Sequence, residues 1–384
     1  MNYTESEERQ ALRAAVADLG AKYGPEYFIR KARAGEKTDE LWREAGRLGY
    51  LGVNVPAEYG GGGGGIGDLA AVCEELAAAG CPLLLMVVSP AICATIIARS
   101  GTEDQKKHWL PRFADGSVKM AFAITEPDAG SNSHRITTTA RRDGDGWVLS
   151  GQKTFISGVD ESDAVLFVSR SSDQKGNLRP SLFIVPTDTP GFNWSPIEME
   201  IVSPEKQFVC HLDDVRLPYD ALVGDEDGGL LQLFAGLNPE RIMASAMGAG
   251  IGRLALAKAT GYAKERQVFK TPIGAHQGLA HPLAAAKIEI ELARLMAQKA
   301  AALYDAGDDL GAGEAANMAK YATAEAAVHA VDTAIQVHGG NGLTSEYGVG
   351  MLAGVVRLMR IAPVSREMIL NFVAQHTLGL PKSY

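Results

Sequence analysis

The pattern of apolar residues changes character twice along the 384-residue chain. Helical spacing prevails over residues 1–118, β-branched and aromatic clusters bounded by Gly, Pro and Asp fill 119–228, and Ala-rich helical spacing returns over 229–384. A chain of this length exceeds the roughly 250–300 residues at which one hydrophobic core stops growing. We therefore expect an α+β multidomain protein with an N-terminal α-helical domain, a central β domain and a C-terminal domain of the four-helix-bundle type.

Each segment predicts specific elements. The predicted helices span 6–19, 40–48, 66–79, 102–113, 230–265, 278–306, 312–338, 343–359 and 364–378. The predicted strands include 147–149, 164–168, 182–185 and 208–212. Asp143–Gly146 resembles part of a calcium-binding loop, but no Glu completes the ligand set at the end of such a loop. Because Asp-Gly is common hairpin chemistry, we expect a turn there.

Glycine-rich segments have structural interpretations as well. The six consecutive glycines Gly60–Gly65 lack the Lys-Ser/Thr of a phosphate-binding loop, so we interpret them as a flexible connector. Gly248–Gly252 follows no predicted strand and lies inside a helical pattern, where small residues allow close approach of helices. A stripe packed inside the helical bundle is predicted by four apolar residues at helical spacing, Ile288, Leu292, Leu295 and Met296.

Charge and cysteine content narrow the functional classes. The 37 basic and 46 acidic residues give a net charge of −9 without a visible Lys/Arg run, so nucleic acid is not an expected partner. The N-terminus shows no signal-like apolar segment, and prolines and a serine break the longest apolar stretch, 81–98. We expect a cytoplasmic protein without a membrane partner. No metal site is predicted, and buried free thiols are expected at Cys73, Cys81, Cys93 and Cys210.

Five segments carry a family resemblance. Ala123–Asn132 is followed about 20 residues later by Gly151–Gly158, and the two resemble the paired flavin-binding segments of the acyl-CoA dehydrogenase family. The resemblance continues, in the family's order, through Pro56–Gly61, Asp214–Pro218 and Gln336–Gly342. It implies the family's fold, FAD as cofactor, and oxidation of an acyl-CoA thioester to the 2,3-enoyl-CoA. It further implies that the electrons pass to an electron-transfer flavoprotein.

The resemblance also implies FAD contacts in the β domain. A flavin ring is a flat, largely apolar plate with a polar edge, so its site needs an aromatic or β-branched wall together with hydroxyl and backbone groups. The implied contacts are Phe122, Ile124, Thr125, Gly130, Ser131, Phe155 and Ser157. Ser131 is also a candidate substrate contact. The family more often has Trp and Thr where this chain has Phe155 and Ser157.

A second set of FAD contacts is implied near the C-terminus: Arg266, Phe269, Gln277, Gln336, Gly339, Gly340, Ser365 and Glu367. The first three match residues that reach the FAD of a neighbouring subunit, where the forked, permanently charged guanidinium of Arg266 can meet the pyrophosphate. The glycines match a segment whose bare backbone approaches the adenosine side. The resemblance therefore implies a homotetramer or a homodimer.

The implied reaction needs a carboxylate that removes the α-proton of the thioester. Most family members carry it in an Ile-x-Glu-Gly-Thr segment near the C-terminus, but Pro363 stands at that position here. A minority, the isovaleryl- and long-chain-type enzymes, place it in a Glu-Arg pair early in the bundle, which matches Glu240 and Arg241. We expect Glu240 to be the catalytic base and Arg241 to orient it and contact substrate. The next candidate carboxylates are Glu346 and Glu367.

The surroundings of Glu240 are also predicted. Pro239 is expected to open the helix, which places Glu240 in its first turn, where the helix dipole lowers the pKa of a carboxyl whereas burial raises it. The alternative is a Glu in a surface ion pair. Pro363 has no N–H, so one backbone donor to the thioester oxygen is missing or moved, unless a one-residue register shift makes Ala362 the donor.

Pro363 leaves two other functions open. A protein of the same fold could act on a CoA thioester by different chemistry, desulfinase-like or oxygen-using. A non-catalytic, DNA-associated flavoprotein of the damage response conflicts with the net charge of −9. The length of the acyl chain is not predicted, because one methylene changes discrimination by only about 1–3 kcal/mol.

Overall fold

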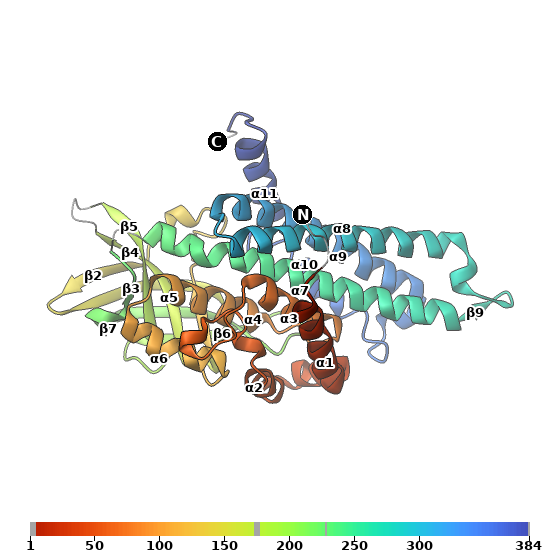
Figure 1. Cartoon of the computed structure of the whole chain (residues 1–384), viewed down its shortest axis with the longest axis horizontal. Coiled ribbons are helices and arrows are strands. Elements are labelled where there is room, and N and C mark those ends of the chain that lie inside the picture. Colours follow the sequence, from red (N-terminus) through yellow and green to blue (C-terminus); the bar gives the residue numbers. More distant parts are fainter. Residues whose placement is uncertain (1–4, 173–176, 227–228, 383–384) are drawn as a thin grey trace.

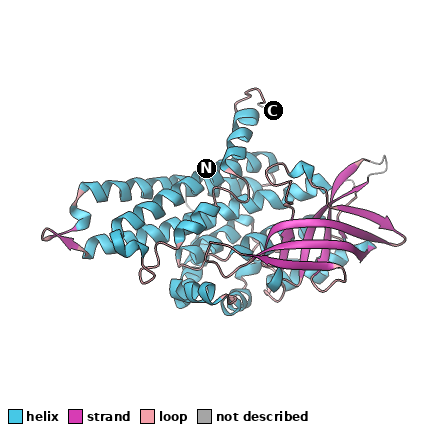
Figure 2. Cartoon of the chain, turned by 180° about the vertical axis from the view of Figure 1, so that it is seen from behind, coloured by secondary structure: helices cyan, strands magenta, loops and turns pink. Residues whose placement is uncertain are grey.

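The computed structural model describes residues 5–172, 177–226 and 229–382 and shows an elongated molecule with its sheet at one end (Figure 1). Long helices lead away from the sheet toward the opposite end (Figure 2). The order of elements is helical, then β, then helical, which confirms the expected α+β class. Within the described ranges, no helix combines the length and apolar character needed to cross a membrane.

The N-terminal part consists of helices. They are α1 (Glu7–Ala34), α2 (Asp39–Arg47), α3 (Ile66–Ala78), α4 (Leu84–Val88), α5 (Thr95–Ser100) and α6 (Glu103–Ala114). Ser6 and Thr102 cap α1 and α6, each accepting a hydrogen bond from a backbone N–H three residues further on. Helix α1 extends past its predicted end and consists of two helical stretches that meet at a kink, where Gly24 has the non-helical φ of +70°.

The apolar stretch 81–98 is helical from Leu84 onward despite Ser89 and Pro90. It forms α4, a π-helical turn η3 (Ser89–Ala94) and α5. Ser89 Oγ accepts the N–H of Met120 at 3.1 Å, and Pro90 lies in the first turn of η3. π-Helical turns are frequent at functional sites. This turn buries Cys93 completely against the sheet.

The six-glycine segment is a fixed loop, so the expectation of a flexible connector is wrong. Residues 62–64 each donate a backbone hydrogen bond of 2.8–2.9 Å to carbonyl groups of residues 52–55. A Cβ at Gly61 would lie 2.2 Å from the carbonyl oxygen of Val55. Glycine is therefore required by close backbone packing, which composition alone does not reveal.

The central part is an eight-stranded sheet. Its strands are β1 (Met120–Ala123), β2 (Thr139–Asp143), β3 (Gly146–Ser157), β4 (Ala164–Ser172), β5 (Leu178–Pro186), β6 (Phe192–Ile197), β7 (Gln207–Pro218) and β8 (Leu222–Val223). The order is β6-β7-β3-β2-β4-β5-β8, and β1 pairs in parallel with β4. Asp143 pairs with Gly146, and Gly144 has φ +59°, which confirms the predicted hairpin turn.

The C-terminal part is built on three long helices, α7 (Gly229–Glu265), α8 (Gln277–Asp305) and α9 (Asp309–His338). A small hairpin of β9 (Gln267–Val268) and β10 (Thr271–Pro272) joins α7 to α8. The shorter α10 (Leu352–Leu358) and α11 (Arg366–Phe372) follow. The predicted helix 343–359 is reduced to α10, because residues 339–343 form a 3-10 turn and Gly348 has φ +63°.

Small residues of α7 bring its neighbours close, as predicted. A Cβ at Gly248 would lie 2.9 Å from Thr323 of α9, and one at Gly252 would lie 2.3 Å from Ile290 of α8. The contacts of α7 with α9 advance in the same direction along both helices, so these helices run parallel, whereas α8 runs antiparallel to them. The glycine-rich run is therefore a packing feature of the bundle.

The predicted apolar stripe of α8 does not pack inside the bundle. Ile288, Leu292 and Leu295 are 60%, 62% and 47% exposed, and Met296 alone is partly buried. The face of α8 that packs against α7 and α9 consists mainly of small residues: Ala286, Ile290, Ala293, Ala297, Ala300 and Ala301. Helical spacing identified an apolar face correctly but assigned it to the wrong side of the helix.

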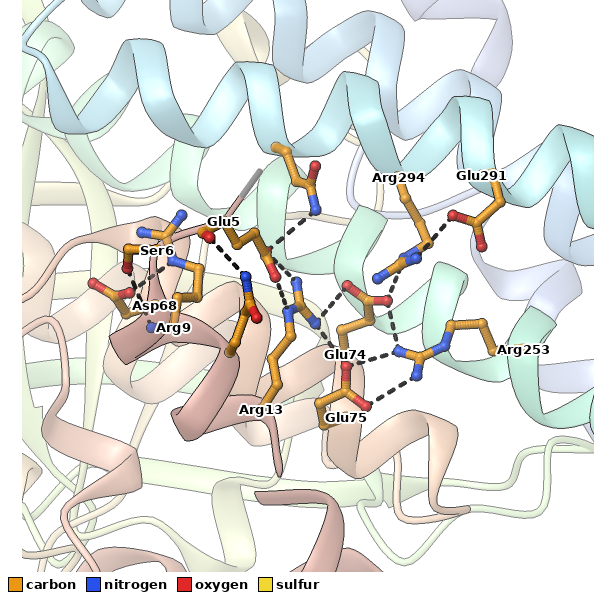
Figure 3. A network of polar contacts seen from close by, with 12 residues as sticks. Glu5, Ser6, Arg9, Arg13, Asp68, Glu74, Glu75, Arg253, Glu291 and Arg294 are labelled. Carbon is orange, nitrogen blue, oxygen red and sulfur yellow. Dashed lines mark hydrogen bonds and ion pairs between the residues drawn. The ribbon is translucent and has the colours of Figure 1, made fainter. Parts of the chain in front are cut away.

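A network of ion pairs ties the first helix to the bundle (Figure 3). Arg13 of α1 contacts Glu74 and Glu75 of α3 at 3.0 and 2.7 Å. Arg253 of α7 reaches Glu75 at 2.8 Å, and Arg294 of α8 reaches Glu74 at 2.5 Å. Burial alone would raise the pKa of Glu75, but the two facing arginines hold it below its usual value. Four helices thus share one set of charges.

Candidate active site

The two segments predicted to hold the flavin lie side by side at the ends of β1 and β3. Ile124 and Thr125 directly follow β1, and the N–H of Thr154 in β3 donates to the carbonyl oxygen of Thr125 at 2.9 Å. The pairing of β3 with β7 shifts register between Lys153 and Ile156, and Phe155 has φ +57°. This bulge turns the Phe155 ring outward, where it is 58% exposed.

The remaining β-domain contacts differ in exposure. Phe122 is buried, whereas Gly130 and Ser131 lie in an exposed loop after a turn closed between Glu126 and Ala129. The Ser157 hydroxyl is hydrogen bonded to the Gln207 side chain at 3.1 Å. The structure thus groups Ile124, Thr125, Phe155 and Ser157 on two adjacent segments, with Ser131 on a separate loop.

A buried ion pair joins these two segments, and neither of its residues was among the predicted site residues. Lys153, which is 0% exposed, donates to Glu126 at 2.8 Å and to the Ile124 carbonyl at 3.0 Å. Burial lowers the pKa of Lys153 to about 8 against the opposing effect of Glu126. Burial opposes ionisation of Glu126, yet Lys153 and the Thr137–Thr138 donors lower its pKa to about 2. No local sequence pattern marks this pair, because Lys153 and Glu126 are 27 residues apart in the chain.

Six residues of the second predicted set of FAD contacts lie at the far end of the molecule. Arg266, Phe269 and Gln277 flank the β9–β10 hairpin, opposite the sheet in Figure 1, and all three are exposed. Phe269 is 89% exposed. One copy of the chain therefore does not bring these residues to Phe155 and Thr125.

Gln336, Gly339 and Gly340 are exposed at the same far end. His338, between them, stacks on Tyr262 of α7 with ring centroids 4.5 Å apart, and Asn341 donates to the Tyr262 hydroxyl at 3.1 Å. A Cβ at Gly339 or Gly340 would meet nothing within 4 Å. This segment thus presents open backbone next to the hairpin.

Glu240 lies in the interior of α7, so the prediction that Pro239 opens the helix is wrong. The helix begins at Gly229, and Pro239 lies inside it. Glu240 consequently gains no N-terminal dipole. Burial raises the pKa of Glu240 to about 7, although Arg241 and Lys320 act in the opposite direction. A carboxyl with this pKa can exist in both protonation states near neutral pH.

The groups around Glu240 come from three elements. Cys93 of η3 faces it closely enough that the carboxylate adds to the effect of burial in raising the pKa of the thiol. Arg241 donates to the Leu237 carbonyl at 3.2 Å and to Asn238 Oδ1 at 3.3 Å. Lys320 of α9 is only 2% exposed and was not predicted as a site residue.

The turn before α11 contains Ala362, Pro363 and Ser365, and Glu367 follows in the first turn of α11. The Ala362 N–H donates to the Leu358 carbonyl at 2.9 Å, so it is already used within the protein. Ser365 caps α11 by accepting the Met368 N–H at 3.3 Å. The alternative carboxylates Glu346 and Glu367 are both exposed.

These residues fit FAD. The half-exposed Phe155 ring beside Ile124 and the hydroxyl-bearing Thr125 offers an apolar wall with a polar group, and the exposed glycines and Arg266 suit a nucleotide and its pyrophosphate. Near Glu240, the Nε of Arg241 is buried and has no hydrogen-bond partner among the described residues. An unpartnered guanidinium nitrogen there is consistent with a bound polar group.

Comparison with known proteins agrees with this geometry. Models of the N-terminal, middle and C-terminal domains of acyl-CoA dehydrogenases match residues 6–117, 121–209 and 227–378. The chain belongs to the acyl-CoA dehydrogenase family of FAD-dependent enzymes. It is 68% identical to acyl-CoA dehydrogenase FadE12 of Mycobacterium tuberculosis strain H37Rv, covering 100% of this chain and 99% of that protein.

Solved structures show the same fold. A glutaryl-coenzyme A dehydrogenase in complex with glutaryl-CoA superposes with a TM-score of 0.93 at 30% identity, covering 100% of this chain and 98% of that one. A glutaryl-CoA dehydrogenase from Mycobacterium smegmatis, in complex with FADH2, superposes with a TM-score of 0.90 at 27% identity over 99% and 96% of the two chains. FAD is therefore the cofactor of this enzyme class and of this chain.

Proposed function

We propose that this chain oxidises an acyl-CoA thioester between C2 and C3, with Glu240 removing the α-proton. Bound FAD supplies the two-electron oxidant that takes the β-hydrogen as hydride. Protonated Glu240 then holds the α-proton until the enoyl-CoA leaves. We further propose that an electron-transfer flavoprotein reoxidises the enzyme.

The surroundings of Glu240, inside α7 and facing Cys93, Arg241 and Lys320, carry this proposal. A thioester α-C–H is a very weak acid. The base that removes its proton must therefore be desolvated and must have a pKa close to neutral pH. Burial raises the pKa of Glu240 to about 7, whereas Glu346 and Glu367 are exposed and have no such environment. Among the three candidate carboxylates, only Glu240 has the electrostatic surroundings that the reaction requires.

The other residues take roles around this base. Arg241 orients Glu240 and balances its negative charge. Ser131 contacts the acyl-CoA or the flavin phosphate. The residues that surround the flavin ring are Phe122, Ile124, Thr125, Phe155 and Ser157, and the further FAD contacts are Gly130, Ser365 and Glu367. The Arg266, Phe269 and Gln277 group serves the FAD of a second subunit, together with Gln336, Gly339 and Gly340. Their exposure at the far end of the bundle supports this sharing.

Anaerobic mixing with a panel of saturated acyl-CoAs tests the function directly. Wild-type protein should lose its oxidised flavin absorbance with at least one member of the panel. Glu240→Gln should keep FAD but react roughly 10²–10⁴-fold more slowly, the range over which a general base contributes. Glu346→Gln, which removes an exposed carboxylate, serves as the matched control and should react like wild type.

The alternative is different chemistry on the same CoA ligand. Pro363 has no N–H and the Ala362 N–H is used by Leu358, so neither supplies the thioester donor in this conformation. Wild-type protein that binds acyl-CoAs tightly without flavin bleaching would favour this alternative. Glu240→Gln with an unchanged bleaching rate would instead remove Glu240 from the mechanism and leave the dehydrogenation in place.

A further inference from the structure

Lys320 is a buried cation that the reaction described above does not use. It lies on α9 and is 2% exposed, and its Nζ donates to the carbonyl oxygen of Val364 at 2.5 Å. Val364 belongs to the turn between Pro363 and the start of α11. An ammonium this deeply buried costs stability unless charges or dipoles compensate it. Its position therefore needs an explanation beyond packing.

Helix contacts place Lys320 opposite the candidate base. Gly313 of α9 packs beside Asn238 of α7, and Thr323 packs beside Gly248. Because α7 and α9 run parallel, the part of α9 between these contacts faces the part of α7 that contains Glu240 and Arg241. Lys320 lies in that interval, its Nζ contacts the Val364 carbonyl, and it is near enough to Glu240 for each charge to act on the pKa of the other.

The charges that face Lys320 come from several elements. Burial lowers its pKa to about 8, and Arg241 acts in the same direction. Glu240 of α7, Glu367 of α11 and Glu325 of α9 act against this shift. Glu325 is itself paired with Arg360 at 2.7 Å and Arg366 at 3.4 Å, and Glu367 is paired with Arg366, so Glu240 is the carboxyl left to balance Lys320.

We propose that Lys320 is a positioning residue that ties the Pro363–Ser365 turn to α9 and supplies the positive charge against which Glu240 ionises. This inference rests on Glu240 being the base. It gives Lys320 a role that Arg241 does not fill, because Arg241, which also acts to lower the pKa of Glu240, donates to Leu237 and Asn238 and not to the turn. The ammonium thus joins the geometry of the turn to the protonation of the base.

The charge role makes a specific kinetic prediction for Lys320→Met. Removing a nearby cation disfavours the carboxylate, so the pKa of Glu240 should rise above about 7. The rate of anaerobic flavin bleaching should then fall roughly tenfold at pH 6, as for a pKa shift of about one unit. Above about pH 9 the wild-type Lys320 is itself neutral, because its pKa is about 8, and the two rates should converge.

Three controls separate this effect from a general loss of structure. Lys320→Arg keeps the charge, so its acid limb should stay at the wild-type pH even if the overall rate falls. Lys22→Met removes a 61% exposed lysine of α1 and should leave the whole profile unchanged. The proposal would be overturned if Lys320→Met lowered the bleaching rate by the same factor at every pH, or left the rate unchanged at every pH. Equal shifts of the acid limb in the Met and Arg variants would also overturn it.

A second readout does not depend on turnover. The carboxyl stretch of protonated Glu240 can be followed by infrared pH titration of the FAD-loaded protein without substrate, and assigned by its loss in Glu240→Gln. The band should disappear near pH 7 in wild type and at higher pH in Lys320→Met. Identical titrations would refute the role of Lys320 while leaving Glu240 as base. Unchanged bleaching by Glu240→Gln would instead refute the proposed function on which this role rests.

Discussion

At the scale of single residues, the candidate site depends on charges that the fold removes from water. Glu240, Lys320 and Lys153 all have a pKa shifted by burial, and each is placed by a helix or strand rather than by a loop. Loops would let such groups turn back to solvent. Regular elements packed on both sides prevent this, so their protonation can be set by a few neighbours.

Lys153→Met tests the buried ion pair of Lys153 and Glu126, which joins the two flavin segments. The change leaves Glu126 buried without its cation, which should cost about 3–5 kcal/mol of unfolding free energy and raise the pKa of Glu126 from about 2. Denaturant unfolding near pH 7 gives the free energy. Lys22→Met, at an exposed ion pair, should cost at most about 1 kcal/mol. Equal losses in the two variants would mean that the buried pair contributes no more than a surface one.

The same pair predicts how stability depends on acid. The pKa of Glu126 is about 2 in the folded chain and below its usual value, so its contribution is fully present above the unfolded pKa. That contribution should be lost as pH falls from about 5 to 2. Glu126→Gln should therefore unfold with a weaker dependence on pH across this interval than wild type, as measured by thermal unfolding. Parallel pH curves for the two proteins would contradict the assignment.

At the scale of elements, small residues decide how closely α7 approaches its neighbours. A Cβ at Gly250 would lie 2.4 Å from the Glu74 carbonyl of α3, whereas a Cβ at Gly261 of the same helix would meet nothing within 4 Å. Gly250→Ala should thus destabilise the fold by about 1–3 kcal/mol through overpacking. Gly261→Ala should stabilise it by up to about 1 kcal/mol, because alanine is the better helix former. Denaturant unfolding distinguishes the signs, and stabilisation by both would disprove the close approach.

Elements were predicted well where local pattern determines them. Most helices and the hairpin turn at Asp143–Gly146 follow from periodicity and turn chemistry, which act within a few residues. The prediction that Pro239 opens a helix was wrong because packing on both sides keeps this proline inside a long helix, despite the lost backbone hydrogen bond. The Gly60–Gly65 loop and the Lys153 pair depend on partners distant in sequence, which no local pattern reveals.

At the scale of the whole molecule, the predicted cofactor contacts fall at two ends of one chain. Phe155 lies at the sheet and Phe269 at the opposite end, and both aromatic rings are exposed. The resemblance supplied the residues of both groups, but the distance between them emerges only from the assembled fold. A second copy of the chain that places its Phe269 end near this Phe155 would complete one site from two subunits.

Leu292→Asp tests the surface that such an assembly would bury. Ile288, Leu292 and Leu295 form an exposed apolar stripe on α8, the helix that begins at Gln277 beside the shared contacts. A charge there should be tolerated by an isolated chain but not inside an interface, so the variant should have a lower molar mass by light scattering and retain less FAD. Leu310→Asp, at a 90% exposed leucine on α9, is the matched control and should keep the wild-type mass. Unchanged mass and FAD content for Leu292→Asp would show that α8 faces solvent and that the subunits, if they associate, do so through another surface.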